Sequence, residues 1–549
     1  MLPRIQMEWP RFRKEHLEDI PQEYNWGTDW IDRLGKEEPE RVALIHTDGN
    51  AVAAFTFREI SELSSAFARY LQDRGMGRGD RVMIMLGNQP MLWVSFVGVI
   101  KAGGVCVPSA TSLRPSDIDY RITKGNISGA IIEDSVQGAL AGLRHKLRYV
   151  VSVPDDIDVD RLRKMPHSFT PVATRPSDVS LIYFTSGTTG HPKMVAHSQV
   201  SYALGHYSTA MWLGIGRGDV HWNISSPGWA KHAWSSIYAP WNVAATTVSF
   251  SYTGRFRAAD HLGVIEKLRV TSVCASPTVW RMFILEDLSR YDLSSLRSAA
   301  SAGEPLNPEV IERFRNATGI TIRDGYGQTE TTLQIGNFPG MQVKDGSMGV
   351  ASPFYRIAVV DDSGRELPPM TEGNIAIRVA EGRPLPLMLG YMEEENNRQA
   401  FHDGWYFTGD RAYVDADGYF WYVGRSDDVI KSSGYRIGPF EVESALLRHP
   451  SVAESAAVAS PDQIRGAIVK CFVVLKPGYE PSYELARELA EFVAQETAPY
   501  KHPRKIEFVS SLDPVKTISG KIRRKALREM EYGGPRVVQG SEFEIPPLR

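Results

Sequence analysis

The sequence is poor in cysteine and carries almost no net charge. Its 549 residues include three cysteines, and its formal net charge is -3. Cys106, Cys274 and Cys471 lie far apart in apolar runs and form no C-x-x-C pair. We therefore expect buried free thiols in a reducing compartment, which favours a cytoplasmic location over a disulfide-stabilised secreted protein. The small net charge gives no general attraction to nucleic acid, so we expect no nucleic-acid partner.

Long hydrophobic runs are also missing. The longest one, residues 91–100 (MLWVSFVGVI), ends at Lys101 and is too short to cross a membrane. Residues 1–16 hold no apolar stretch of signal-peptide length. We expect no transmembrane segment and interpret residues 91–100 as a core helix. The sequence is compatible with a homo-oligomer but does not fix the oligomeric state.

Length and hydrophobic patterning predict an α/β protein of more than one domain. The chain is longer than a single-core domain, and 42% of its residues are hydrophobic. Apolar strand patterns alternate with helical ones, which indicates doubly wound sheets. We expect a large N-terminal domain over residues 1–426, made of doubly wound α/β sheets plus a β-rich subdomain. A small mobile α+β domain over residues 427–535 and a surface tail over residues 536–549 should follow.

The segment YFTSGTTGHPK, residues 183–193, has the composition of a polyphosphate-binding loop. Its hydroxyl side chains and backbone N–H groups can face phosphate oxygens, and Gly187 and Gly190 permit the positive φ angles that such a nest needs. Lys193 adds a positive charge. The segment is not a Walker A loop, because Pro192 stands where the second glycine would be.

Five further segments follow in a recognisable order. They are SAGEPL (301–306), DGYGQTE (324–330), WYFTGD (405–410), GRSDDVIKSSGYRIGPFEVE (424–443) and KTISGKIRR (516–524). Together with residues 183–193, they resemble the signature segments of the adenylate-forming superfamily, which includes acyl-CoA synthetases, peptide-synthetase adenylation domains and beetle luciferases. The resemblance covers roughly residues 30 to 530, and it is greatest to the medium-chain acyl-CoA synthetases.

The resemblance implies a two-step reaction. ATP and a carboxylic acid give an acyl-adenylate and pyrophosphate, and CoA then gives acyl-CoA and AMP. The implied cofactors and substrates are ATP, Mg²⁺, coenzyme A and a small carboxylic acid. Because the first step brings two anions together, the site must neutralise both the carboxylate and the α-phosphate.

The resemblance also implies a nucleotide site. The implied residues are Thr185, Ser186, Gly187, Thr188, Thr189, Gly190, Lys193, Gly303, Glu304, Pro305, Asp324, Gly325, Tyr326, Gly327, Gln328, Thr329, Asp410, Arg425, Arg436 and Lys521. In this interpretation Tyr326 stacks on adenine and Asp410 accepts from the ribose hydroxyls. Glu330 would position Mg²⁺, as a hard cation prefers oxygen ligands.

Lys521, Arg436 and Thr185 are the implied catalytic residues. Lys521 lies in a basic run that would otherwise suggest a solvated surface, so its assignment rests on the SGK context. Its ammonium would reach the carboxylate and the α-phosphate, where negative charge develops.

Residues beyond the large domain are implied in domain movement and CoA binding. Asp427, after GRS, matches the hinge about which the small domain swings between the two half-reactions. The implied CoA contacts are Ser432, Ser433, Gly434 and Arg465, with Arg114 as a weaker candidate.

The acyl pocket is the least constrained part of the site. Acetate-specific relatives hold tryptophan where this chain has Gly327, which predicts space for a longer or bulkier acid. Trp229, His232 and Trp234 lie in the matching helix and are expected to line the pocket, although aromatic residues packing a core helix would look the same. Medium-chain, branched and aromatic acids such as benzoate all remain open.

Other functions fit less well. A peptide-synthetase adenylation domain would be followed by a carrier domain, and a luciferase-like oxidation would need O₂ chemistry that no sequence feature demands. A non-enzymatic nucleotide-binding scaffold would be expected to lack Lys521 or Glu330, and both are present.

Overall fold

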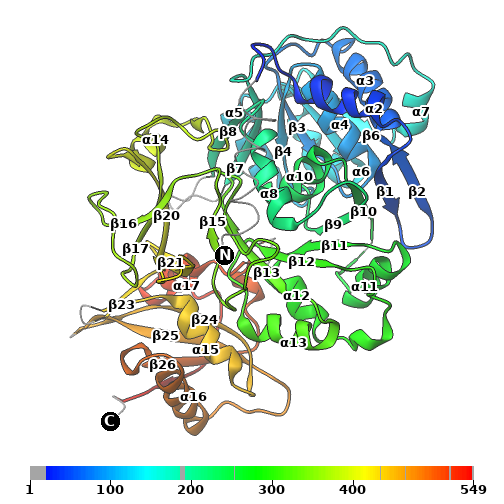
Figure 1. Ribbon diagram of the computed structural model, residues 1–549. Helices are drawn as coiled ribbons and strands as arrows, with labels where there is room; N and C mark the ends of the chain where they lie inside the picture. The colour runs from blue at the N-terminus through cyan, green and yellow to red at the C-terminus, as the bar shows by residue number, and fades with distance from the viewer. Residues whose placement is uncertain are drawn as a thin grey trace.

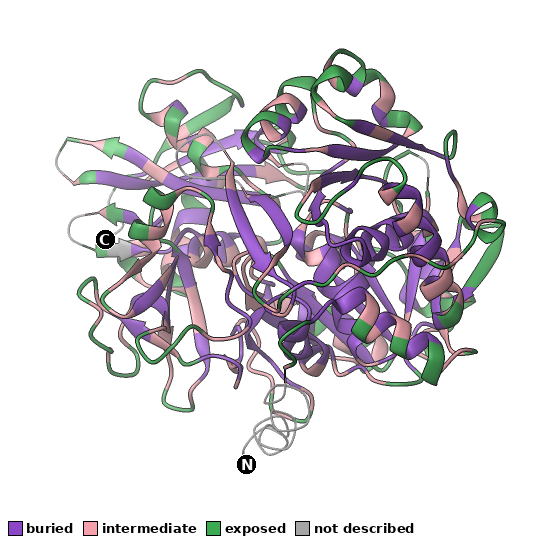
Figure 2. Ribbon diagram, turned by 90° about the horizontal axis from the view of Figure 1, so that it is seen from above, coloured by how far each residue is buried: buried purple, intermediate pink, exposed green. Residues whose placement is uncertain are grey.

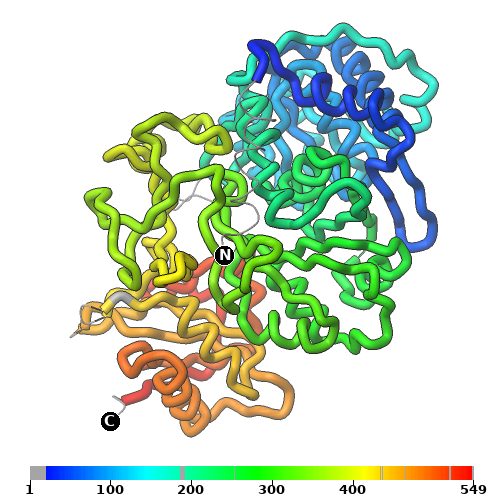
Figure 3. Tube along the Cα trace, viewed as in Figure 1, coloured from blue at the N-terminus to red at the C-terminus, as the bar shows by residue number. Residues whose placement is uncertain are grey.

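The computed structural model describes residues 20–185, 192–252, 254–432, 435–463, 465–517 and 521–546. Two large α/β sheets and a smaller β-sheet form most of the chain, and a separate sheet with its own helices follows near the C-terminus (Figure 1). The trace of the C-terminal part lies against the smaller sheet and the end of one large sheet (Figure 3). No described helix is long and apolar enough to cross a membrane.

The first large sheet has seven strands. In spatial order these are β18 (Gly390–Tyr391), β8 (Lys193–Ser198), β7 (Val179–Thr185), β4 (Val105–Pro108), β3 (Arg81–Met85), β5 (Gly129–Glu133) and β6 (Tyr149–Val153). The pairs from β7 to β6 are parallel, whereas β8 runs antiparallel to both β7 and β18. The central strands are buried along nearly their whole length, as expected for parallel strands covered by helices on both faces.

The second large sheet has nine strands. In spatial order these are β15 (Val350–Ala351), β14 (Leu333–Gly336), β13 (Ile322–Gly327), β12 (Ser298–Ala302), β11 (Ser272–Ala275), β9 (Val220–Ile224), β10 (Thr246–Phe250), β1 (Val42–Thr47) and β2 (Val52–Thr56). The run from β13 to β1 is parallel, and antiparallel strands close both ends. The carboxyl ends of β12 and β13 therefore lie side by side, which is the edge where ligands bind in such sheets.

Helices cover these sheets. They are α2 (Asp32–Glu37), α3 (Phe57–Gln72), α4 (Pro90–Lys101), α5 (Pro115–Gly125), α6 (Asp134–Leu140), α7 (Val159–Arg163), α8 (Tyr207–Leu213), α9 (Ala230–His232), α10 (Ala239–Asn242), α11 (Ala258–Lys267), α12 (Pro277–Phe283), α13 (Pro308–Thr318) and α14 (Glu394–Ala400). Two π-helical segments, η1 (Trp26–Ile31) and η4 (Ala233–Tyr238), and the 3₁₀ turns η2 (Ala141–Lys146), η3 (Leu204–His206) and η5 (Leu288–Arg290) complete this part.

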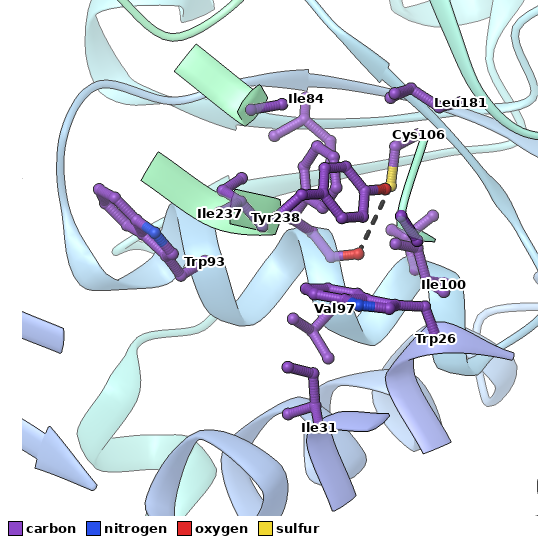
Figure 4. Packing of buried hydrophobic residues seen from close by; sticks show 14 of the residues in the cluster. Trp26, Ile31, Ile84, Trp93, Val97, Ile100, Cys106, Leu181, Ile237 and Tyr238 are labelled. Carbon is purple, nitrogen blue, oxygen red and sulfur yellow. Dashed lines mark hydrogen bonds between the residues drawn. The ribbon is translucent and has the colours of Figure 1, made fainter. Parts of the chain in front are cut away.

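Local sequence features account for two of these helices. Thr56 and Glu59 form a capping box at the start of α3. The apolar run 91–100 lies within α4 and is buried throughout. Figure 4 shows Trp26, Trp93 and Tyr238 packed around α4, with the Cys106 thiol directed at a backbone carbonyl of that helix. All three cysteines are buried and unpaired, as predicted.

A third sheet forms the expected β-rich subdomain. Its strands are β16 (Ile357–Val360), β17 (Gly373–Arg378), β20 (Trp405–Val414), β19 (Phe401–His402) and β21 (Phe420–Arg425). Strands β20 and β21 pair antiparallel and form a hairpin.

The C-terminal part is a compact α+β unit. It contains the hairpin β22 (Ile430–Ser432) and β23 (Tyr435–Ile437), the sheet β24 (Val452–Asp462), β25 (Gly466–Leu475), β26 (Lys505–Val509) and β27 (Gly540–Glu544), the helices α15 (Pro439–Arg448), α16 (Tyr483–Glu496) and α17 (Arg524–Glu531), and the 3₁₀ turns η6 (Pro499–Lys501) and η7 (Asp513–Val515). Strand β27 falls within the expected tail, so part of that tail is an edge strand of this sheet.

A buried charge cluster ties the end of the chain to this unit. The Lys470 ammonium, on β25, is fully buried and donates to Glu507 on β26, Glu531 on α17 and Glu542 on β27. Burial alone would lower the pKa of Lys470, but these hydrogen bonds raise it.

Across the molecule, exposed residues lie mainly on helix faces and loop ends, and the strands are mostly buried (Figure 2). The doubly wound α/β fold with a smaller C-terminal α+β unit is thereby confirmed.

Candidate active site

Asp410 is the centre of a hydrogen-bond network at the edge of the second sheet. It lies on β20 and is buried. Its Oδ2 accepts from the Tyr326 hydroxyl at 2.7 Å and from Gln328 Nε2 at 2.6 Å, and its Oδ1 accepts from the Tyr422 hydroxyl at 3.2 Å. Tyr406 in turn donates to Gln328 Oε1 at 3.1 Å. Residues 326–328 and the β20–β21 hairpin, far apart in sequence, thus converge on one carboxylate. An anion so placed is suited to accept hydrogen bonds from a sugar.

Arg425 lies opposite Asp410 on the paired strand β21. The negative charge of Asp410 raises the pKa of Arg425 further above its usual range. Its Nε also lies 3.4 Å from Asp427 Oδ1. The guanidinium is exposed, so it remains accessible to a phosphate or ribose.

Lys521 reaches this site from the C-terminal unit. A Cβ built on Gly303 would lie 4.0 Å from both Lys521 Cε and Nζ, and Gly303 has a φ of +110° that few other residues adopt. Burial by the surrounding protein lowers the pKa of Lys521, while Glu304 and Asp410 act in the opposite direction. Part of the side chain still contacts solvent, so the group is desolvated only in part. The C-terminal unit is therefore oriented with its lysine at the nucleotide segments.

Two further carboxylates, Glu304 and Asp324, lie near the ends of β12 and β13, and both act on the buried Lys231. Glu304 Oε1 accepts from Arg281 at 3.2 Å and from Thr278 at 3.4 Å. Asp324 is buried and accepts from the backbone N–H groups of Leu306 and Gly325. Burial raises the pKa of Asp324 to about 8.

Glu330 has the surroundings of a cation ligand. Its Oε1 accepts from the Tyr391 hydroxyl at 2.7 Å, and the Lys193 ammonium lies 5.2 Å from the centre of the Tyr391 ring. Burial raises the pKa of Glu330, and a cation bound to this carboxylate would act in the opposite direction. These residues fit Mg²⁺, a hard cation that takes few protein oxygens together with phosphate oxygens.

The predicted phosphate-binding segment, residues 183–193, begins and ends on two paired strands. Thr185 ends β7 and pairs with Lys193, the first residue of β8, so the loop connects two rigid antiparallel strands. Residues 186–191, which include the predicted Ser186, Gly187, Thr188, Thr189 and Gly190, lie outside the described residues.

The residues predicted to line the acyl pocket lie close together, but the space expected at Gly327 is filled. His232 is buried, and one of its ring nitrogens lies 2.9 Å from Asn88 Oδ1. Burial lowers the pKa of His232 to about 3, so the ring is neutral. The buried Nε1 of Trp229 has no hydrogen-bond partner among the described residues. The space beside Gly327 is filled by the Trp234 ring, which lies 2.5 Å from where a Cβ would stand.

Lys231 is a site residue that motif reasoning missed. Its ammonium donates to the Ala302 carbonyl at 3.1 Å. Burial lowers the pKa of Lys231; Cys274, Glu304 and Asp324 oppose this effect, and the nearby Lys521 ammonium adds to it. The sequence indicated Lys231 only through its position between Trp229 and Trp234, two residues predicted to line the acyl pocket.

The predicted hinge residue lies in a turn between the two parts of the chain. Backbone N–H groups of Asp428 and Val429 donate to the Arg425 carbonyl. Asp427 is exposed, and its own carbonyl accepts from Arg528 on α17.

The predicted CoA residues lie away from this site. Ser432 ends β22, and the labelled β23 lies at the outer edge of the C-terminal unit, far from the two large sheets (Figure 1). Ser433 and Gly434 are outside the described residues, and of Arg436 only the backbone, paired with Lys431, is described. Arg465 lies near Arg504, which the motifs did not indicate, and both arginines act on His502, whose pKa is lowered mainly by burial.

Arg114, the weaker CoA candidate, is exposed just before α5. Its backbone N–H donates to Asp117 at 3.3 Å.

Comparison with known proteins defines the class. The model of the AMP-binding enzyme family matches residues 31–392, and that of the AMP-binding enzyme C-terminal domain matches residues 441–521. The sequence is 46% identical over 517 residues to 4-hydroxybutyrate–CoA ligase 1 of Metallosphaera sedula, covering 92% of this chain and 91% of the relative. It is 42% identical over 534 residues to the mitochondrial acyl-coenzyme A synthetase ACSM3 of Homo sapiens, covering 93% and 90%.

Solved structures of CoA ligases superpose on this chain over nearly its whole length. The anthranilate CoA ligase AuaEII in complex with anthranoyl-AMP superposes with a TM-score of 0.84 at 31% identity, covering 93% of this chain and 98% of that one. A benzoate CoA ligase from Burkholderia xenovorans LB400 gives 0.80 at 27% identity, covering 92% and 100%. The chain belongs to the AMP-binding enzyme family of adenylate-forming enzymes. Within that family it is an AMP-forming acyl-CoA synthetase, an acid–thiol ligase that uses ATP, Mg²⁺ and CoA.

Proposed function

We propose that the enzyme activates a monocarboxylic acid with an apolar tail, in the medium-chain or branched class. The observation that carries the proposal is the closed, uncharged setting of His232, which is buried with a ring nitrogen 2.9 Å from Asn88 Oδ1, and burial lowers its pKa. A neutral ring offers no positive charge to a second carboxylate, and Trp234 adds an apolar surface beside it. The relatives' names include aromatic acids and 4-hydroxybutyrate, so benzoate-like and hydroxylated acids are the second candidates.

Adenylate formation requires charge neutralisation at the reacting centre. In the proposed roles, Asp410 holds the ribose and Tyr326 packs on the adenine. Lys521 contacts the acid carboxylate and the α-phosphate, where its charge favours the transition state over the separated anions. Glu330 would hold Mg²⁺, which when bound would supply Lewis-acid stabilisation of the negative charge on the phosphates.

Thioester formation requires a different face of the C-terminal unit. In the present orientation Lys521 lies beside Gly303, and the labelled β23 lies at the outer edge of the C-terminal unit (Figure 1). We therefore assign this orientation to adenylation, and rotation about Asp427 would bring the β22–β23 hairpin to the site. Arg465 and the neighbouring Arg504 would supply positive charge for the phosphates of CoA.

The compartment is a separate proposal. The unpaired cysteines favour the cytoplasm, whereas the ACSM3 relatives are named as mitochondrial. Fractionation of the source cells, with an antibody to this chain, tests it.

A panel of carboxylic acids tests the function. The purified enzyme is incubated with ATP, Mg²⁺, CoA and straight acids from C2 to C12, branched acids, 4-hydroxybutyrate, benzoate and a dicarboxylate. AMP and thioester are measured together. We expect equal amounts of both products with apolar monocarboxylates and little with the dicarboxylate. A preference for the dicarboxylate would contradict the proposal.

A further inference from the structure

We propose that His197 is a positioning residue for the metal-binding carboxylate, because it holds the turn that carries Glu330 against strand β8. The proposal rests on the metal-binding role proposed above for Glu330 and adds the residue that places this carboxylate. His197 lies on β8, four residues after Lys193, and outside every segment that the sequence motifs indicated.

Strands β8 and β18 direct two polar side chains toward the second large sheet. Tyr391 of β18 is paired with Val195, two residues before His197 on β8. Side chains two residues apart on a strand share a face, as do directly opposed residues of an antiparallel pair. His197 and Tyr391 therefore lie on one face of the first sheet. That face is turned toward the end of β13, since the Tyr391 hydroxyl donates to Glu330 and the His197 ring contacts Thr329.

Glu330 lies in a tight turn that follows β13. A main-chain hydrogen bond of 3.2 Å closes the turn of residues 328–331, so Thr329 and Glu330 occupy its two central positions. Their carbonyls find partners outside the turn. The Glu330 carbonyl accepts from the Met388 N–H at 2.8 Å, and the Thr329 carbonyl lies 2.7 Å from Nε2 of His197. Both peptide groups that flank the Glu330 side chain are therefore held by other parts of the chain.

The direction of the His197 hydrogen bond follows from its partner. A carbonyl oxygen has lone pairs but no proton, so Nε2 carries the hydrogen and donates it to Thr329. The other ring nitrogen, Nδ1, lies 3.2 Å from the Ser201 hydroxyl. The His197 ring is fully buried, and its centre lies 4.2 Å from that of the Tyr202 ring. Because the ring is held on β8 by these neighbours, it fixes the position of the Thr329 carbonyl.

The position of this carbonyl matters for the bound metal. The Glu330 carboxylate is placed by its hydrogen bond from Tyr391 and by the main chain of the turn. Mg²⁺ demands near-ideal ligand geometry, and groups that orient its ligands typically account for roughly 10–100-fold in metal affinity. Loss of the His197 contact lets the turn shift and leaves the carboxylate chemically unchanged. We therefore expect weaker metal-dependent binding of the nucleotide and unchanged metal-free binding.

Two amide variants separate the roles of the two ring nitrogens. In His197→Gln the side-chain N–H can reach the position of Nε2, whereas in His197→Asn it reaches only that of Nδ1. Binding of α,β-methylene-ATP, which cannot release AMP, is measured by calorimetry with and without Mg²⁺ on the full chain. We expect the gain in affinity caused by Mg²⁺ to fall by roughly tenfold or more in His197→Asn and by less than about threefold in His197→Gln.

The chain offers a matched control in His221. This ring is also fully buried, with Nδ1 at 3.0 Å from the Ser272 hydroxyl and Nε2 at 2.9 Å from the Ser235 hydroxyl. His221→Asn thus loses an Nε2 partner in the same way, but none of these contacts involves the turn of residues 328–331. We expect a lower melting temperature and an unchanged effect of Mg²⁺. Glu330→Gln, measured in the same way, should remove the effect of Mg²⁺.

The outcomes separate positioning from packing. A loss of the Mg²⁺ effect in His197→Asn alone, with His197→Gln and His221→Asn like the parent, supports the proposal. Equal losses in both His197 variants, or an equal loss of metal-free affinity in His197→Asn, overturn it. If His197→Asn does not fold, His197→Gln decides alone, since a Mg²⁺ effect like the parent's supports the proposal and a loss of about tenfold overturns it. An undiminished Mg²⁺ effect in Glu330→Gln would instead contradict the proposed metal-binding role of Glu330.

Discussion

Arg528 donates to the main-chain carbonyl of Asp427 at 2.5 Å, and its Nη1 lies 3.1 Å from Asp428 Oδ1. The helix that begins three residues after Lys521 therefore also contacts the predicted hinge. Arg528 therefore links the segment that carries the lysine to the hinge turn.

Replacing Arg528 should weaken this coupling. Arg528→Gln removes a charged hydrogen bond and an ion pair that exist in the present orientation, so the adenylation state becomes less populated. We expect ATP–pyrophosphate exchange to fall by about 3–10-fold, while thioester formation from supplied acyl-AMP is unchanged. Arg487→Gln, which breaks an exposed pair with Glu491, is the control and should affect neither step. Equal loss of both steps in Arg528→Gln would argue against a coupling role.

Lys521→Ala should separate the half-reactions most clearly. Its ammonium lies beside Gly303 and is surrounded by Glu304 and Asp410, so its loss removes charge from the reacting centre. We expect adenylation to fall by roughly 10²–10³ while supplied acyl-AMP is still converted to thioester. Lys525→Ala, four residues later on the same segment, should retain both activities. A parallel loss of thioester formation in Lys521→Ala would refute the assignment.

The hinge can be tested by restricting one dihedral angle. Asp427→Pro fixes φ near −65° and should hold the C-terminal unit in one orientation, which we expect to be the adenylation one. Adenylation should persist and CoA-dependent turnover should be lost. Asp427→Ala, which keeps φ free, serves as the control. Full CoA-dependent turnover by the proline variant would show that rotation occurs elsewhere.

Gly327 should resist substitution altogether. The sequence predicts that Gly327→Trp merely shortens the acyl pocket, but the Thr332 carbonyl and the Trp234 ring already occupy the position of a Cβ. Even Gly327→Ala should therefore cost about 1–3 kcal/mol in the free energy of unfolding through overpacking. Thermal and denaturant unfolding measure this cost. Gly138→Ala, on a helix with nothing within 4 Å of the new methyl, is the control. An alanine at 327 without loss of stability would mean that the strand shifts readily.

Asp324 should give the apo enzyme a specific pH dependence. Its pKa rises from 3.8 to about 8 on folding, so the folded chain binds this proton more tightly than the unfolded chain. The contribution is fully present below about pH 4 and is lost as the pH rises to about 8. In Asp324→Asn this dependence disappears, so the variant gains stability relative to the parent between pH 4 and pH 8. Denaturant unfolding at several pH values measures it, and a constant difference across that range would contradict the shift.

Motifs and periodicity predicted the fold and the nucleotide segments because both depend on short stretches of sequence. Alternating strands and helices, the capping box at Thr56 and the run in α4 could all be read locally. The resemblance indicated Asp410, Glu330 and Lys521, which the structure brings to one edge. Contacts between distant segments could not be read in this way. The filling of the space at Gly327 depends on a helix about ninety residues earlier, and the positions of Lys231 and Arg504 depend on tertiary packing.

The cluster around Lys470 determines which C-terminal truncations the protein should tolerate. A chain shortened to end at residue 535 would lose Glu542 and the last strand, and β26 would become the open edge of its sheet. Unpaired edges pair with other chains, so such a truncation is expected to aggregate even though every motif residue is retained. Purification tags therefore belong at the N-terminus, or beyond residue 546.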